Sequence, residues 1–333
     1  MQAYVMTRYG DASAMELRDV PEPAPSSGEV LIRVRAAGLN PVDFKIREGK
    51  MRLLKRLDLP MVAGSELSGA VEAIGDGVTR FAVGDRVFAR VDKDKLGAYA
   101  PYAVVDEALV AKMPTSLDFA DAAGLPLAGL TALQALRDEL AVKAGDRVFI
   151  SGGAGGVGTL AIQLAAWLGA TVATTASPRG EELVRSLGAE TVIDYRTQKF
   201  KDQLSDYDGA FDLTGGQDLL DSFAILKRGA RTVSIAGIPD ATTARVDLGA
   251  GPLLTAVLTA ASAKIRRAAR RKGVGYRYLF MHPSGADLEV LAGLVDKGML
   301  KTVTDRVFPF EQIADAFAYL EQGHAKGKVV VQL

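Results

Sequence analysis

Short apolar runs alternate with helical patterns over the middle of the chain, and this alternation restricts the possible folds more than any other feature. Between the runs lie stretches such as VGTLAIQLAAWLG and GEELVRSLG, which repeat with helical spacing and end in Gly. Strands that alternate with helices form βαβ units, which build a parallel, doubly wound sheet. The sequence therefore predicts an α/β domain with strands at residues 148–151, 171–175, 191–194, 209–213 and 232–237.

The eight residues SGGAGGVG at 151–158 follow the first of these runs and precede a helical pattern. Gly153, Gly155 and Gly158 satisfy the G-x-G-x-x-G pattern, which between a strand and a helix is typical of dinucleotide binding. Bare backbone there lets a pyrophosphate approach the free N–H groups at the start of the helix. The cofactor-binding residues predicted for this loop are Gly153, Ala154, Gly155, Gly156 and Val157.

The end of the second strand indicates which dinucleotide is bound. NAD-binding domains carry an acidic residue there for the ribose 2′-OH, but residues 171–180 contain no Asp or Glu. Ser177 and Arg179 offer a hydroxyl and a guanidinium instead, which suit a 2′-phosphate. Tyr195, after the third strand, adds another hydroxyl. These residues predict NADP(H).

The sequence on either side of this domain lacks the alternation of strands and helices. About the first 110 residues contain short β-like runs broken by Gly, Pro and Asp, which predict an irregular antiparallel β domain. The end of the chain has two helical patterns and a last strand, GKVVVQL, and we expect it to fold back onto the first domain. The predicted domains are residues 1–123 with 283–333, and a cofactor domain of residues 124–282.

Composition excludes several classes of protein. Lys+Arg and Asp+Glu are both 40, so the overall charge does not call for nucleic acid or a membrane as the main partner. The absence of Cys excludes disulfides, Cys-ligated zinc and thiol nucleophiles. The apolar stretch at 253–263 is too short to span a bilayer, and the N-terminal residues lack a secretory pattern. We expect a cytoplasmic protein.

Several segments resemble the medium-chain dehydrogenase/reductase superfamily, in particular its zinc-free quinone oxidoreductase and enone reductase branch. They run in family order along nearly the whole chain: AAGLNPVDFKIREG (36–49), PMVAGSELSGAVEAIGDGV (60–78), GDRVFA (84–89), LPLAGLTALQAL (125–136), GGAGGVGTLAIQLA (152–165), LGAETVIDYR (187–196) and HAKGKVVV (324–331). The resemblance implies a GroES-like, mostly β catalytic domain, a Rossmann cofactor domain and a cleft between them. It also implies a homodimer joined through the strand near residues 274–280.

The chain departs from the zinc alcohol dehydrogenases of this superfamily at the metal ligands. Those enzymes carry Cys near residue 40 and His in a G-H-E motif, whereas this chain has Asn40 and Ser65, in Gly64-Ser65-Glu66. A tetrahedral zinc site with N and S ligands cannot be built from these residues. Without a metal, the feasible chemistry is hydride addition to an activated acceptor, either a conjugated C=C bond or a quinone. An enone leaves an enolate that hydrogen-bond donors stabilise.

The resemblance also implies which other residues form the site. Asn40 is expected to contact the nicotinamide ribose or the substrate oxygen, while Asp43 and Lys45 position charge; Tyr99 and Tyr102 are weaker candidates for the cleft. The remaining expected cofactor contacts are Thr131, Ala236, Gly237, Ile238, Phe280, Met281 and Lys328.

Two alternatives stay open. A quinone reductase and an enone reductase need the same cofactor and a flat apolar cleft, so the sequence does not separate them. The segment 264–272 holds six basic residues behind the apolar run PLLTAVLTAA, as in helices that lie on anionic membranes or contact RNA. An NADPH-binding protein with such a peripheral role is the second reading, and a solvated helix face is the plainer explanation of the same residues.

Overall fold

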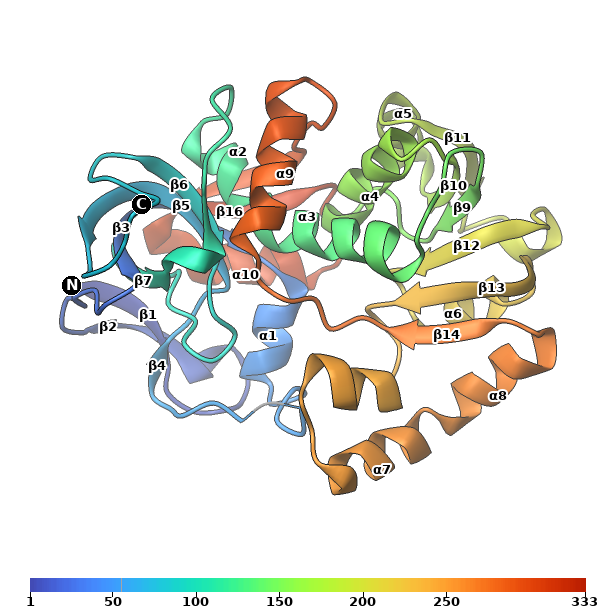
Figure 1. The fold of residues 1–333 in the computed structure, drawn as a ribbon, viewed down its shortest axis with the longest axis horizontal. Coiled ribbons are helices and arrows are strands. Elements are labelled where there is room, and N and C mark those ends of the chain that lie inside the picture. Colours follow the sequence, from blue (N-terminus) through green and yellow to red (C-terminus); the bar gives the residue numbers. More distant parts are fainter. Residues whose placement is uncertain (55) are drawn as a thin grey trace. The chain divides into compact units, whose positions relative to one another are not determined.

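The apolar runs of the middle region form a parallel sheet in the computed structural model, which describes residues 1–54 and 56–333 (Figure 1). The strand order is β11-β10-β9-β12-β13-β14, and all the neighbours pair in parallel. The doubly wound sheet predicted from the sequence is thereby confirmed. Its strands are β9 (Arg147–Ile150), β10 (Thr171–Ala176), β11 (Ala189–Asp194), β12 (Tyr207–Asp212), β13 (Leu226–Ser234) and β14 (Gly275–Tyr278).

Helices connect these strands and cover the sheet, because parallel strands are apolar on both faces. Leu219 and Phe223, from the helix after β12, pack with Ala269 and Val274 in one core cluster. Phe149 stacks on Phe200 in another. The helical elements are α4 (Gly156–Trp167), α5 (Pro178–Ser186), η4 (Phe200–Asp202), α6 (Gly216–Ser222), the π-helical η5 (Thr243–Asp247), α7 (Pro252–Ala261) and α8 (Ala263–Lys272).

The flanking sequence forms antiparallel β structure, as its short β-like runs predicted. A larger sheet has the order β15-β16-β3-β5-β6-β8, with β7 also paired to β3, and a smaller one has the order β2-β1-β4. The strands are β1 (Gln2–Met6), β2 (Met15–Asp19), β3 (Glu29–Leu39), β4 (Met61–Val62), β5 (Glu66–Ile74), β6 (Arg86–Arg90), β7 (Tyr102–Asp106), β8 (Val110–Lys112), β15 (Thr304–Pro309) and β16 (Lys328–Gln332).

The helices of this part are short. Those that matter for the site are α1, which begins directly after Asn40, and α2, which packs beside β3 and β16. The helical elements are η1 (Ala12–Ala14), α1 (Pro41–Arg47), η2 (Glu107–Leu109), α2 (Phe119–Ala123), α9 (Gly285–Asp296), η6 (Phe310–Gln312) and α10 (Ile313–Glu321). From this part, α3 (Pro126–Leu133) and the π-helical η3 (Gln134–Glu139) lead into the middle region.

The end of the chain returns to the first sheet, as expected. In β16, Val329 and Val331 pair antiparallel with Leu39 and Ala37 of β3. The chain accordingly divides into two compact units, the first made of Met1–Leu130 with Pro283–Leu333 and the second of Thr131–His282. The first boundary between the two units lies inside α3, between Leu130 and Thr131, rather than between residues 123 and 124. Gly129 of α3 lies against the Leu291 side chain of α9, which holds the start of α3 to the first unit.

Several strand boundaries differ from the sequence-based expectation, and two of them bear on the site. Strand β13 ends at Ser234, whereas the apolar run suggested a strand through Gly237. The Ser234 hydroxyl accepts hydrogen bonds from the N–H groups of Ala236 and Gly237, and these bonds turn the chain out of the sheet. Strand β7 begins at Tyr102, so Tyr99 precedes it. Among the described residues, no helix is long and apolar enough to cross a membrane.

Candidate active site

The glycine-rich loop between β9 and α4 is packed so tightly that side chains are excluded at two of its motif positions. A Cβ at Gly153 would lie 2.2 Å from the Thr174 hydroxyl oxygen of β10, and one at Gly158 would lie 2.4 Å from the Gly152 carbonyl oxygen. Gly155 differs, because the nearest atom to its Cβ position is the Gly152 oxygen at 3.4 Å. The fold needs the first two glycines, whereas at Gly155 the bare backbone leaves open space for a ligand.

Gly155 is also the N-cap of α4, and no side chain caps the helix. The first intrahelical bond runs from the Thr159 N–H to the Gly155 carbonyl at 3.0 Å, so the earlier N–H groups of α4 have no acceptor within the helix. These N–H groups and the positive end of the helix dipole favour an anion. The residues predicted to bind the pyrophosphate, Gly153, Ala154, Gly155, Gly156 and Val157, lie at this end of α4.

A buried carboxylate holds the ends of three neighbouring strands. Asp212, at the end of β12, accepts hydrogen bonds from the Ser234 hydroxyl at 2.6 Å and the Gly215 N–H at 2.9 Å. The Ser151 hydroxyl donates at 3.3 Å to Oδ1, the same oxygen that accepts the Gly215 N–H. Burial raises the pKa of Asp212, and these hydrogen bonds oppose the rise. Because Ser234 in turn binds the N–H groups of Ala236 and Gly237, this network positions two of the predicted cofactor residues.

The start of α5 lies against the glycine-rich loop. A Cβ at Gly180 would come within 2.9 Å of the Ala154 Cβ, so the two loops touch. Ser177 is the N-cap of α5, and its hydroxyl makes no capping bond. The Arg179 side chain is exposed two residues later. The predicted 2′-phosphate residues thus lie beside the predicted pyrophosphate loop.

The register of β10 and β11 brings Tyr195 to the same edge of the sheet as Ser177 and Arg179. Ala176 at the end of β10 pairs with Asp194 at the end of β11, so the next residues, Ser177 and Tyr195, leave the same edge of the sheet together. The Tyr195 side chain is 59% exposed. Its hydroxyl is thus on the surface that the predicted cofactor site requires.

Of the other predicted cofactor contacts in the second unit, two are positioned by hydrogen bonds from different elements. The Ile238 N–H and carbonyl both bind the Tyr276 hydroxyl, at 3.0 and 2.7 Å, and the Phe280 N–H donates to Asp247 at 3.2 Å. Met281 is half-buried, and Thr131 is buried in α3. The structure brings Ile238 to the carboxyl edge beside Gly237. Thr131 and Met281 stay predicted cofactor contacts.

The first unit contains a buried polar cluster around Asn40. The Asn40 Nδ2 group donates to Glu66 Oε1 at 2.8 Å, and the Lys328 ammonium donates to the Asn40 Oδ1. The same ammonium lies 2.7 Å from Glu66 Oε1 and donates to the Leu39 carbonyl at 3.2 Å. Glu66 Oε2 accepts the Leu127 N–H at 2.6 Å. The carboxylate on one side and the ammonium on the other fix the orientation of the Asn40 amide.

A second carboxylate, Asp43, lies beside this cluster. It accepts hydrogen bonds from the Asn40 N–H and the Tyr99 hydroxyl, both at 2.8 Å, and from the Ser65 hydroxyl. Burial raises the pKa of Asp43, against the opposing effects of these bonds and of the Arg90 charge. Burial also raises the pKa of Tyr99 well above its ordinary value, so that Tyr99 stays a hydrogen-bond donor. Asp43 is positioned to hold Asn40 in place.

Two predicted site residues, Lys328 and Lys45, differ in how they relate to this cluster. Lys328, a predicted cofactor contact, has a buried ammonium that three oxygen acceptors engage, so it also supports the Asn40 amide. Lys45 was grouped with Asn40 and Asp43, but it lies on α1 half-buried, and among the described residues its ammonium joins none of the bonds of the cluster. Burial, with a smaller effect of Lys50, lowers the pKa of Lys45.

Sequence reasoning missed Glu66 and Arg90 and gave Tyr99 little weight. All three are buried, and Glu66 and Tyr99 are 0% exposed. The signal for Glu66 was a single acidic residue at the head of an apolar strand, since an unpaired carboxylate is rarely buried. No comparable signal marks Tyr99, because a Tyr in a β-like run is usually a packing residue.

The donor atoms of this cluster do not suit zinc. Residues 40 and 65 supply an amide and a hydroxyl, and both Glu66 oxygens are already engaged by an ammonium and N–H donors. Zinc sites use Cys, His and carboxylate ligands that are free to bind the ion. Among residues 1–54 and 56–333, no group of three or more such side chains could hold a metal.

Two family models match the chain. The model described as "Alcohol dehydrogenase GroES-like domain" matches residues 26–115, and the one described as "Zinc-binding dehydrogenase" matches residues 187–331. The first range covers β3 to β8 with the Asn40 cluster, and the second begins after the glycine-rich loop and reaches Lys328. The match to the second model does not restore the missing ligands at residues 40 and 65.

Curated relatives are similar over almost the whole chain. The chain is 38% identical to an "NADPH-dependent alkenal/one oxidoreductase, chloroplastic" of Arabidopsis thaliana, over 99% of this chain and 79% of the relative. It is 34% identical to a "2-methylene-furan-3-one reductase" of Solanum lycopersicum, over 99% of this chain and 79% of the relative. Among solved structures, the quinone oxidoreductase from Coxiella burnetii superposes with a TM-score of 0.86 at 33% identity, over 100% of this chain and 99% of the other.

Proposed function

The chain belongs to the medium-chain dehydrogenase/reductase superfamily, in its quinone oxidoreductase and enone reductase branch, and we propose that it uses NADPH to reduce activated acceptors. The most favoured acceptor is the C=C bond of a small α,β-unsaturated carbonyl, with quinones as alternatives. The observation that carries this proposal is the amide of Asn40, held between Glu66 and Lys328 where metal-dependent relatives would need a zinc ligand. The relatives favour this enzyme over a protein that only binds NADPH.

The second unit fits the cofactor. Gly153 to Val157 would hold the pyrophosphate at the start of α4, and Gly155 leaves the space that the phosphates need. Ser177, Arg179 and Tyr195 would bind the 2′-phosphate at the adjacent edge of the sheet. When bound, the reduced nicotinamide supplies a hydride to the β-carbon of the acceptor.

The first unit supplies a fixed hydrogen-bond donor. One N–H of the Asn40 amide is bound to Glu66, and we propose that the other donates to the carbonyl oxygen on which negative charge develops. Asp43 holds the Asn40 backbone N–H, while Lys328 holds its Oδ1, so the amide cannot flip. A proton from solvent then reaches the α-carbon, and hydride and proton together convert C=C to CH–CH.

Product analysis tests the reaction. The purified chain, NADPH and a small enone are incubated with and without a chelator, and the products are identified by mass spectrometry and NMR. We expect the saturated carbonyl, at the same rate with the chelator. An allylic alcohol would show that the carbonyl itself is reduced and would refute the proposal, as would loss of activity together with one zinc per chain. Turnover of quinones alone would assign the chain to the quinone reductases.

The choice of cofactor is tested at the start of α5. We expect NADPH to bind at least about tenfold more tightly than NADH, a difference of about 1.4 kcal/mol. Arg179→Ala should narrow the difference mainly by weakening NADPH. Arg185→Ala, on the same helix and paired with Glu181, is the matched control and should leave the preference intact. Equal affinities of the unaltered chain for the two cofactors would contradict the proposed role of Ser177 and Arg179.

We also propose a homodimer and a cytoplasmic location. Strand β14 lies at the end of the strand order of its sheet, so one of its edges is free in a single chain. A second copy that pairs there would extend the sheet.

The cytoplasmic location is supported by composition only, since the Arabidopsis thaliana relative is described as chloroplastic. Cell fractionation with an antibody to the chain decides it.

A further inference from the structure

Helices α7 and α8 form one almost continuous helical element along the second unit (Figure 1). They meet at Ser262, where the backbone hydrogen bonds continue from one helix into the next. The Ser262 N–H donates to the Leu258 carbonyl at 3.0 Å, and the Arg266 N–H donates to the Ser262 carbonyl at 3.0 Å. Residues three or four apart therefore share a face from the start of α7 to the end of α8.

The outward face of α7 is apolar. Leu253 is 80% exposed and Val257 is 43% exposed, with the exposed Ala256 and Ala260 beside them at helical spacing. Leu258, on the opposite side, is buried. An isolated exposed Leu needs no explanation, but a row of apolar side chains on one helix face marks a surface that contacts another apolar phase.

The same face of α8 is basic. Lys264, Arg267 and Arg271 continue the spacing of the α7 row, and all three are exposed. No acidic residue occurs in residues 248–286, although the whole chain has 40 acidic and 40 basic residues. The positive charge of α8 therefore has no acidic counterpart in its own segment. We call the exposed row Leu253, Ala256, Val257, Ala260, Lys264, Arg267 and Arg271 the α7–α8 face.

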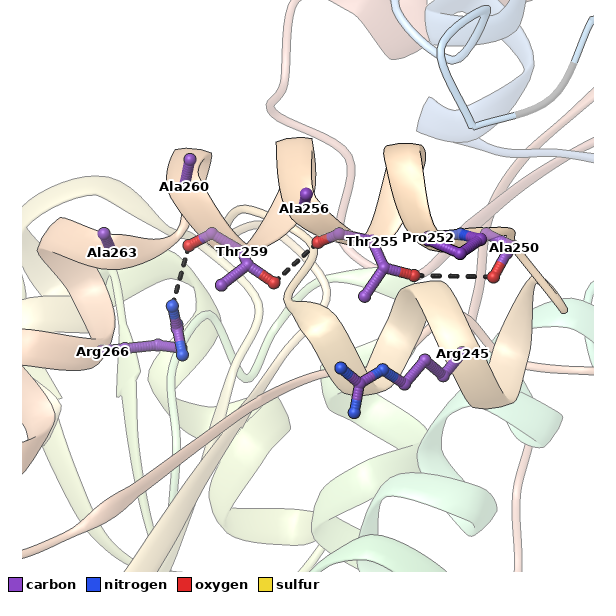
Figure 2. A pocket seen from close by; sticks show the side chains of 9 residues that line it. All are labelled: Arg245, Ala250, Pro252, Thr255, Ala256, Thr259, Ala260, Ala263 and Arg266. Atoms are coloured by element: carbon purple, nitrogen blue, oxygen red, sulfur yellow. Dashed lines mark hydrogen bonds between the residues drawn. The ribbon is translucent and has the colours of Figure 1, made fainter.

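A groove beside α7 adds two more cations. Its volume is about 610 Å³, and Arg245 of η5 and Arg266 of α8 are among its lining residues (Figure 2). The hydroxyls of Thr255 and Thr259 bind carbonyls of their own helix, and Arg266 donates to the Thr259 carbonyl at 2.8 Å. The Arg266 Nε is buried and has no hydrogen-bond partner among the described residues. These two cations add to the positive charge beside the α7–α8 face.

We propose that the α7–α8 face docks on the surface of an anionic lipid bilayer. Leu253 and Val257 would enter the boundary between headgroups and acyl chains, and the bases of α8 would contact the lipid phosphates, with Arg245 and Arg266 beside them. A second copy fits less well, since two basic faces would repel each other. RNA would satisfy the charges but would leave Leu253 and Val257 in water. The proposal concerns where the enzyme acts and does not depend on the proposed reaction.

Vesicle co-sedimentation tests the proposal. The full chain, without cofactor or substrate, is mixed with vesicles of phosphatidylcholine alone or of phosphatidylcholine with phosphatidylglycerol. We expect binding to the anionic vesicles only, and we expect it to weaken as salt is added, because the lipid phosphates provide the attraction. Equal binding to neutral vesicles, or no binding to anionic ones at low salt, would overturn the proposal.

Two variants locate the surface. Lys264→Gln with Arg267→Gln and Arg271→Gln should weaken binding to anionic vesicles by at least about tenfold. Leu253→Glu with Val257→Glu should do the same, because the apolar row can no longer enter the bilayer. The matched controls are Lys50→Gln with Lys143→Gln and Lys297→Gln, which lose the same charge at scattered sites, and Val83→Glu with Val307→Glu, at valines 65% and 42% exposed.

The controls should bind as the unaltered chain does, and all variants should reduce a water-soluble acceptor at the same rate. Controls that weaken binding as much as the α7–α8 variants would show a general charge effect and overturn the proposal. If Leu253→Glu with Val257→Glu instead halves the mass in solution while vesicle binding is absent, the face joins two copies, and the bilayer is excluded. Binding of the unaltered chain to transfer RNA in preference to anionic vesicles would also overturn it.

Discussion

At the scale of single residues, the strongest structural constraint is the ion pair of Lys328 and Glu66. Their side chains are 7% and 0% exposed, and the ammonium and the carboxylate each have further hydrogen-bond partners. A buried pair of this kind contributes little net stability, but removing one partner leaves an uncompensated charge in a medium of low dielectric. The orientation of Asn40 depends on both members of the pair.

Lys328→Met should therefore lower the free energy of unfolding by about 3–5 kcal/mol, because the Glu66 charge is left without its cation. Adding Glu66→Gln should restore much of that loss. Arg196→Met, which breaks the exposed pair with Asp194, is the control and should have a much smaller effect. The measurement is urea unfolding of the four proteins. If the double variant is no more stable than Lys328→Met, charge burial is not the cause.

Asp43 gives the first unit a dependence on pH. Burial raises the pKa of Asp43 in the folded chain above its pKa in the unfolded chain. The chain therefore loses stability as the pH rises from the unfolded-state pKa through the folded-state pKa, because ionised Asp43 is disfavoured in the folded chain. The Ser65 hydroxyl opposes this by binding the ionised form. Ser65→Ala should therefore cost least at the lowest pH at which the chain stays folded, where Asp43 is protonated. The cost should grow as the pH rises, to about 1–3 kcal/mol once the ionised carboxylate is left without this donor.

Urea unfolding at several pH values checks this prediction. Ser186→Ala is the control, because its hydroxyl binds the Leu183 carbonyl, which does not titrate. A cost of Ser65→Ala that is the same at every pH would show that the Ser65 bond does not act through the ionisation of Asp43.

At the scale of elements, two glycines of the loop before α4 are expected to have different roles: Gly153 in packing and Gly155 in cofactor binding. Gly153→Ala should destabilise the chain, because its Cβ would lie 2.2 Å from the Thr174 oxygen. Gly155→Ala should unfold at almost the same urea concentration as the unaltered chain, because the added Cβ meets only one oxygen, at 3.4 Å. It should nevertheless bind NADPH at least about tenfold more weakly, since the methyl group occupies the space of the phosphates.

Urea unfolding and NADPH titration of both variants decide this point together. A Gly155→Ala variant that keeps full NADPH affinity would show that the phosphates do not approach this part of the loop. If Gly155→Ala lowers the free energy of unfolding, the added Cβ clashes with the loop, and Gly155 is needed for the fold as well.

At the scale of the whole molecule, the free edge of β14 predicts the oligomer. We expect a mass in solution of twice the 35.2 kDa of the chain, measured by light scattering. Amide protons of Gly275–Tyr278 that face away from β13 should exchange slowly in the dimer and faster on dilution. A mass of one chain would refute the dimer, and a dimer with fast exchange at these amides would place its interface elsewhere.

Local patterns carried most of what could be predicted. The strands and helices of the second unit follow from apolar runs and helical spacing, and the phosphate loop follows from glycines within ten residues of one another. Predictions near the ends of elements were less accurate, as at β13, where the Ser234 hydroxyl ends the strand before the apolar run does. The residue types at 177 and 179 were sufficient to predict NADP(H), because the contrast with an acidic residue is visible without a structure.

The sequence by itself thus determined the parallel sheet, the nucleotide loop and the lack of zinc ligands, because each depends on residues that are neighbours in the chain or on residue types alone. Only the tertiary structure decided how Asn40 is held. Its partners Glu66 and Lys328 lie 26 and 288 positions away, at the ends of β5 and β16. Strand pairing of β3 with β5 and β16 brings them together, and no local pattern records such pairing.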